Sequence, residues 1–98
     1  MEQIERIKHM EKCLDRAAEA VMELSAALKK YAEAQEAIRE LKDYLGSEEW
    51  KADFEADEEK RLPQDLKRGV LSEDGIWNML EDVQQMNSRM LKVVENGR

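Results

Sequence analysis

The feature that most constrains the fold is a long helix-forming segment near the N-terminal end. Residues 2–45 contain no proline or glycine and are rich in Ala, Glu, Lys, Leu and Arg, which have high helix propensities. The segment therefore predicts one helix over residues 2–45, about 66 Å long at 1.5 Å per residue. A compact chain of about 100 residues has a radius of gyration near 13 Å, so a monomeric globule cannot enclose such a helix.

Apolar residues recur along this predicted helix with a heptad period, which is typical of helices that pair with other helices. The pattern is imperfect, because Gln35 and Lys42 occupy core positions and Ile4 and Leu41 lie beside them. This favours a bundle helix with a broad apolar face over a strict two-stranded coiled coil. The apolar core positions are Ile7, Leu14, Val21 and Leu28 in one series, and Met10, Ala17, Leu24, Tyr31, Ile38 and Leu45 in the other.

Stop and start signals divide the rest of the chain. Gly46 is expected to end the first helix, and Ser47 to cap a short second helix that runs to about Glu58. Pro63 is expected to open a helical turn over residues 64–68 that Gly69 would end. These short helices make up a connecting segment over residues 46–71.

A final helix is predicted over residues 72–96. Ser72 supplies the start signal, and Glu73 and Asp74 carry the negative charge that suits a first helical turn. No segment has the alternation expected of a strand. The chain is therefore predicted to be a single all-α domain, residues 1–98. The long N-terminal helix would pack antiparallel against the C-terminal helix in an elongated hairpin or bundle that is dimeric. The apolar residues at helical spacing in the final helix are Ile76, Met79, Leu80, Val83, Met86, Met90, Val93 and Val94.

The dimer follows from the unequal lengths of the two helices. The final helix, about 35 Å long, can cover only half of the first. An antiparallel return places it along the half between Leu24 and Leu45. Eight alanines between residues 17 and 37 also let a neighbouring helix approach closely. In the dimer, either the N-terminal halves of the two long helices pair or each chain covers the other's hairpin. The alternative to a dimer is a bend near Ser25 that folds the first helix into a monomeric bundle. The possible dimer face comprises Ile4, Ile7, Met10, Leu14 and Val21.

Negative charge is concentrated in one short segment. The chain has 23 acidic and 16 basic residues, a net charge of −7. Residues 46–59 alone hold seven acids and one base, and residues 60–71 hold four bases and one acid. Such a cluster suggests calcium, but an EF-hand loop starting at Asp53 would need glycine and glutamate where Glu58 and Gln64 stand. A cation site without a motif, using Asp53, Asp57 and Glu58, stays open beside a solvated acidic helix paired with the basic segment.

The chemistry-bearing residues do not form a catalytic constellation. General acid–base and nucleophilic catalysis need a tuned histidine or carboxylate, or a nucleophile beside a base. The one histidine, His9, is far along the chain from Ser47, Ser72 and the acidic cluster. His9 and the one cysteine, Cys13, are four residues apart and could form half of a metal site, but this spacing is common by chance. We therefore expect no enzymatic activity, no cofactor and no resident metal.

Three large aromatic residues lie just after the predicted helix starts. Trp50, Phe54 and Trp77 are interpreted as a plug that anchors the connecting segment to the end of the hairpin. The alternative is a partner-binding surface, because tryptophan is enriched at binding hot spots. That possible partner surface comprises Trp50, Phe54, Asp57, Glu58 and Trp77.

The N-terminal residues are charged throughout, and no stretch approaches the 20 or so apolar residues that span a bilayer. We therefore expect a cytoplasmic protein that does not associate with membranes. The negative net charge argues against direct nucleic-acid binding, which needs Lys and Arg to neutralise phosphates.

The segment GSEEWKADFEADEEKRLPQDLKRGVLSEDGIWNMLED, residues 46–82, resembles the small bacterial family catalogued as domain of unknown function 4298. Members of that family have a long charged helix followed by a segment of this kind. The resemblance implies a bacterial origin, of Firmicute or mobile-element type. It brings no established activity, so no functional residue is carried over.

Two functions remain. The first is a non-enzymatic helical module that forms a homodimer and binds an unidentified protein. The second is an acidic inhibitor, encoded by a phage or mobile element, that mimics nucleic acid and occupies a basic groove of a partner.

Overall fold

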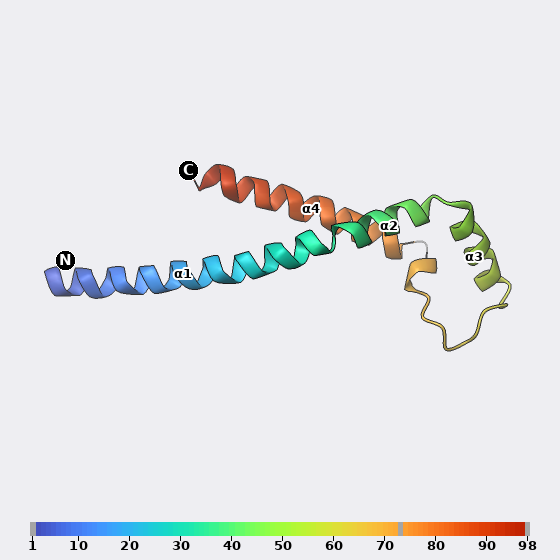
Figure 1. Ribbon diagram of the computed structural model, residues 1–98, viewed down its shortest axis with the longest axis horizontal. Coiled ribbons are helices and arrows are strands. Elements are labelled where there is room, and N and C mark those ends of the chain that lie inside the picture. Colours follow the sequence, from blue (N-terminus) through green and yellow to red (C-terminus); the bar gives the residue numbers. More distant parts are fainter. Residues whose placement is uncertain (1, 73, 98) are drawn as a thin grey trace. The chain divides into compact units, whose positions relative to one another are not determined.

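The computed structural model describes residues 2–72 and 74–97, in which every regular element is a helix (Figure 1). The protein is 82% helical, and the described residues contain no strand, which confirms the all-α prediction. The chain divides into two compact units, residues 1–35 and 36–98. The elements in order are α1 (Gln3–Glu33), α2 (Gln35–Leu45), α3 (Glu48–Glu58), the 3₁₀ helix η1 (Gly69–Leu71) and α4 (Gly75–Asn96).

Helix α1 makes up nearly all of the first unit. The Glu2 side chain caps its start by accepting a hydrogen bond from the Ile4 backbone N–H at 2.7 Å. The helix then continues without interruption through Ser25, the position considered for a bend, to Glu33. None of the residues of α1 is buried. Its stability therefore depends on local helix propensity rather than on packing within its own unit.

The helix expected over residues 2–45 is divided at Ala34. The backbone angle ψ of Ala34 is −9°, which departs from the value near −42° of a regular α-helix. The Ala34 N–H is shared between the carbonyls of Lys30 and Tyr31, each at 3.1 Å, and the Gln35 side-chain amide also donates to the Tyr31 carbonyl at 3.2 Å. A side chain that takes part in the backbone ladder is a known cause of helix distortion. The composition signals missed this break, because Gln35 has a high helix propensity.

Helix α3 has the N-terminal cap that the sequence predicts. Ser47 Oγ accepts a hydrogen bond from the Trp50 N–H at 3.1 Å and donates one to the Tyr44 carbonyl at 2.7 Å. The same hydroxyl therefore joins the end of α2 to the start of α3. The acidic residues Glu48 and Glu49 lie in the first turn, where negative charge is favourable.

Helix α3 ends in a Schellman motif. Lys60 adopts a left-handed conformation with φ of 59°. The Lys60 N–H bonds the Asp57 carbonyl at 3.0 Å, and the Arg61 N–H bonds the Ala56 carbonyl at 2.9 Å. Glycine is the usual residue at this position because it has no Cβ to clash. A lysine there carries a conformational cost that no start or stop signal in the sequence reveals.

The prediction of a short helix over residues 64–68 is wrong. The chain makes only a tight turn there, closed by a hydrogen bond from the Leu66 N–H to the Pro63 carbonyl at 3.2 Å. The short helix comes later, as η1, and it includes the glycine that was expected to end it. The Arg68 guanidinium donates to the Pro63 and Gln64 carbonyls. These bonds occupy carbonyls that a continued helix would have used.

The start of α4 lies three residues after Ser72. Ser72 Oγ accepts from the Gly75 N–H and donates to the Gly69 carbonyl, both at 3.0 Å. A Cβ on Gly75 would lie 2.1 Å from the Gly69 carbonyl oxygen, so only glycine fits this approach of η1 to α4. Asp74 precedes the helix but makes no side-chain cap bond. Glu73, expected in the first turn, lies outside the described residues.

The core of the second unit is small. Leu71 of η1 and Ile76 of α4 are the buried apolar residues of the described chain. Leu80, Val83 and Met90 continue the same face of α4 and are half-buried. The spacing of these α4 residues is that of one helical stripe. The other apolar residues of the predicted α4 pattern, Met79, Met86, Val93 and Val94, are exposed.

Candidate functional site

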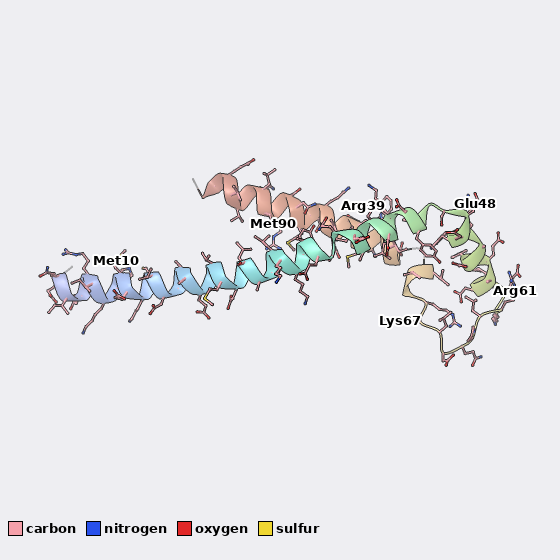
Figure 2. The ribbon with its side chains drawn as sticks, in the orientation of Figure 1. Met10, Arg39, Glu48, Arg61, Lys67 and Met90 are labelled. Atoms are coloured by element: carbon pink, nitrogen blue, oxygen red, sulfur yellow. The ribbon has the colours of Figure 1, made fainter. Side chains whose placement is uncertain are left out.

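The most extensive exposed apolar surface of the first unit runs along α1. We call it the α1 seam and define it as Ile7, Met10, Leu14, Val21, Leu24 and Leu28. These side chains are between 43% and 66% exposed. Figure 2 shows side chains standing out along the whole length of α1, among them the labelled Met10. A soluble monomer rarely exposes so long a continuous apolar surface, so the seam is a candidate binding surface.

Small residues flank the α1 seam on both sides. In the heptad that places Ile7 at position a, the flanking positions e and g are occupied between residues 13 and 34 only by Ala, Ser and Cys. Charged residues are confined to the remaining positions of this stretch. Small flanking side chains allow two helix backbones to come close together. The surface is therefore suited to another helix rather than to a small molecule.

The aromatic residues of α3 contact each other and connect this helix to η1. The Trp50 and Phe54 rings are stacked, with centroids 5.1 Å apart and an interplanar angle of 21°. Trp50 Nε1 also donates a hydrogen bond to the Val70 carbonyl of η1 at 2.9 Å. Both side chains are half-buried. These contacts join α3 to η1 within the connecting segment, and the anchoring of that segment to the end of the hairpin stays a prediction.

Two of the carboxylates considered for a cation site have partners within the chain. Asp57 Oδ1 lies 2.8 Å from Arg68 Nε, and both side chains are about two-thirds buried. Asp53 Oδ2 accepts a hydrogen bond from the Tyr44 hydroxyl at 2.6 Å. This bond, with smaller contributions from desolvation and nearby negative charge, raises the pKa of Tyr44 to about 12. Glu58 is exposed.

The residues described by the structure contain no group of three or more His, Cys, Asp or Glu side chains close enough to hold a metal ion. His9 Nε2 and Cys13 Sγ lie 3.6 Å apart on one exposed face of α1. The basic residues near the acidic helix form local pairs instead: Arg61 bonds Glu59 at 2.8 Å. Figure 2 places Arg61 and Lys67 at the two sides of the loop that connects α3 to η1.

Trp77 lies in α4, whereas the other two aromatic residues of the predicted partner surface lie in α3. Its side chain is 62% exposed and lines a groove of about 520 Å³ between α2 and α4. Leu80 and Val83 form the apolar part of the α4 side, and Ile38 lies opposite on α2. The remaining lining residues are Lys42, Glu81 and Gln84.

Several residues that organise the second unit were not identified from the sequence. The bonds from Tyr44 to Asp53 and from Trp50 to Val70 join residues 9 and 20 positions apart, which no local periodicity reveals. Gly75 did leave a signal, because a glycine in the first turn of a helix costs helix propensity and points to a close backbone approach.

The architecture defines a class of protein: an all-helical chain with one long amphipathic helix whose apolar seam is exposed, followed by a small helical unit. The chain belongs to the family described as domain of unknown function DUF4298, which matches residues 7–93. This confirms the resemblance seen in the sequence. Searches of curated proteins and of solved structures found no match. No helix in the described residues is long and apolar enough to cross a membrane.

Proposed function

We propose that this protein is a non-enzymatic interaction module whose binding surface is the α1 seam, and that its partner is an amphipathic helix. The supporting observation is the exposure of six large apolar side chains in register along one 31-residue helix. A heptad seam with small flanking residues is complementary to another helix that presents the same pattern. The polar residues on the opposite face keep the free helix soluble.

The magnitude of the burial supports the proposal. Fully burying a Leu, Ile, Val or Met side chain stabilises by about 1.5–3 kcal/mol. About half of each seam side chain is exposed, so a partner helix that covers the seam gains roughly 5–9 kcal/mol from these six residues. The partner's own apolar face contributes a similar amount. Association costs on the order of 4–15 kcal/mol, so the burial of both apolar faces has the magnitude that binding to a complementary helix needs.

Photocrosslinking in cells that express the protein tests the proposal. A photoreactive amino acid at Leu24, on the seam, is compared with the same amino acid at Met22. Met22 is the matched control because it is apolar and 74% exposed but lies off the seam. We expect a discrete crosslinked product from position 24 only, either with a second copy or with another protein. Equal yields from both positions, or none from position 24, would contradict the proposal.

The acidic-inhibitor function has less support. A nucleic-acid mimic needs carboxylates that are free to pair with a basic groove. Asp57 and Glu59 instead pair with Arg68 and Arg61 of the same chain. The acidic segment is therefore partly neutralised by the basic segment that follows it.

A further inference from the structure

We propose that the occupant of the α1 seam is the seam of a second copy of this chain, antiparallel to the first, with the two-fold axis at Glu19. This inference rests on the proposed function and goes further by naming the partner, its direction and its register. It is carried by the distribution of side-chain sizes along the seam and by the distribution of charge along the chain.

The antiparallel register pairs every core position. When residue i of one helix faces residue 38 − i of the other, each a position meets a d position, as antiparallel packing of two heptad helices requires. Leu14 then faces Leu24 of the second copy, and Ala17 faces Val21. No layer contains two alanines or two rings. The Ala17–Val21 layers next to the axis are the smallest, but they leave less empty space than a layer of two alanines would. The two outer layers pair Ile7 with Tyr31 and Met10 with Leu28 of the second copy.

The flanking residues fit the same register. Ala18 and Ala20 lie on opposite sides of the seam, each one residue from the two-fold axis, so the backbones can approach most closely at the centre. Toward each end, Glu11 is level with Ala27 of the second copy, two residues from Lys29, an exposed pair of opposite charge that contributes little. All of these side chains are exposed in the single chain.

Charge along the chain also favours this direction. Residues 36–98 hold 16 acidic and 10 basic side chains, a net charge of −6, whereas residues 1–35 carry only −1. The acidic part of the chain, residues 36–98, follows directly after the C-terminal end of α1. A parallel pair would bring two such segments to the same end, whereas an antiparallel pair places them at opposite ends of a helix about 46 Å long. That length exceeds the Debye length of about 8 Å at physiological ionic strength, so the repulsion is screened.

A parallel pair has one compensating feature. It would bring Arg6 beside Glu11 of the second copy, but exposed ion pairs of this kind contribute little. The parallel register would also stack Ala17 on Ala17, which leaves a gap in the middle of the seam, and Tyr31 on Tyr31. Gaps between core side chains are more costly than a surface ion pair is favourable. The packing therefore decides for the antiparallel arrangement.

Spin-label distances test the arrangement in the full-length protein. With Cys13→Ser as the background, one variant carries a label at Glu5→Cys and a matched variant carries it at Glu19→Cys. Both positions are exposed and face away from the seam in the heptad. In the antiparallel pair the labels at position 5 are 28 residues apart along the axis, about 42 Å. The labels at position 19 have no axial offset, so their separation is only the width of the pair.

We expect a long distance from the position 5 variant and a short one from the position 19 variant, with circular dichroism confirming that both remain helical. Two short distances would show a parallel pair and overturn the inference while leaving the proposed function in place. Absence of dipolar coupling in both variants at 100 µM would also overturn the inference. The photocrosslinking comparison then decides the proposed function separately, since a product with a different protein supports it without self-pairing.

Discussion

Replacing Gly75 by alanine tests whether the close approach of η1 to α4 organises the second unit. The new Cβ would lie 2.1 Å from the Gly69 carbonyl oxygen and 2.7 Å from Ser72 Oγ. Carbon and oxygen atoms do not normally approach closer than about 3.3 Å, so the start of α4 must move by about 1 Å. That movement strains both Ser72 hydrogen bonds, which are 3.0 Å long, and it disturbs Ile76 in the core.

The expected effect is the balance of three contributions. Overpacking against backbone costs about 1–3 kcal/mol, and each weakened hydrogen bond costs about 0.5–1.5 kcal/mol. Alanine recovers about 1 kcal/mol through its higher helix propensity. The net prediction is that Gly75→Ala lowers the free energy of unfolding by about 1–5 kcal/mol.

Urea denaturation followed by tryptophan fluorescence measures this effect, because both tryptophans lie in the second unit. Gly69→Ala is the matched control: no atom lies within 4 Å of the position that its Cβ would take, and its φ is not positive. Alanine there restricts the unfolded chain and is expected to stabilise slightly, by about 0.4–1 kcal/mol. A Gly75→Ala protein that is as stable as the wild type, or more stable, would refute the reasoning.

Three further predictions concern the same unit. Lys60→Gly removes the cost of a left-handed lysine and should stabilise by about 0.5–1 kcal/mol in urea denaturation; a loss of stability would contradict the Schellman assignment. Because the pKa of Tyr44 is raised to about 12, the stabilisation from its bond to Asp53 is complete below pH 10 and is lost as pH rises toward 12. Asp53→Ala should return the pKa of Tyr44 toward 10 in an ultraviolet titration, and an unchanged titration would show that the bond is absent. Trp50→Phe keeps a ring to stack but loses the hydrogen bond to η1, so it should destabilise by about 1 kcal/mol, measured by thermal denaturation; no change would show that this bond is not needed.

The candidate surface was predictable where it depends on a local period. The heptad spacing of Leu14 and Val21 identified a helix face in need of a partner, and the structure leaves both side chains exposed. The prediction of a dimer stays a prediction, since the structure contains one chain. The five residues grouped as a possible partner surface lie in different environments. Trp50 and Asp57 contact residues outside α3, and Phe54 stacks on Trp50 within it. Glu58 is exposed, and Trp77 lines a groove. The sequence showed only that the three aromatic residues follow helix starts, and this could not distinguish the residues with partners in the chain from the exposed one.

The sequence by itself determined the helical class, the cap at Ser47 and the apolar seam of α1, because propensity, capping and amphipathic period are properties of neighbouring residues. Only the tertiary structure decided that Tyr44 bonds Asp53 and that Trp50 bonds Val70. Three local features also became clear only in the folded chain: the interruption of the first helix, the turn over residues 64–68, and the need for glycine at position 75. Each of these depends on a competing partner for a backbone group: the Gln35 amide at Tyr31, the Arg68 guanidinium at Pro63, and the carbonyl of Gly69 against α4. Helix propensity is outweighed where the folded chain gives a backbone carbonyl another hydrogen-bond donor, or where a neighbouring backbone leaves no room for a side chain.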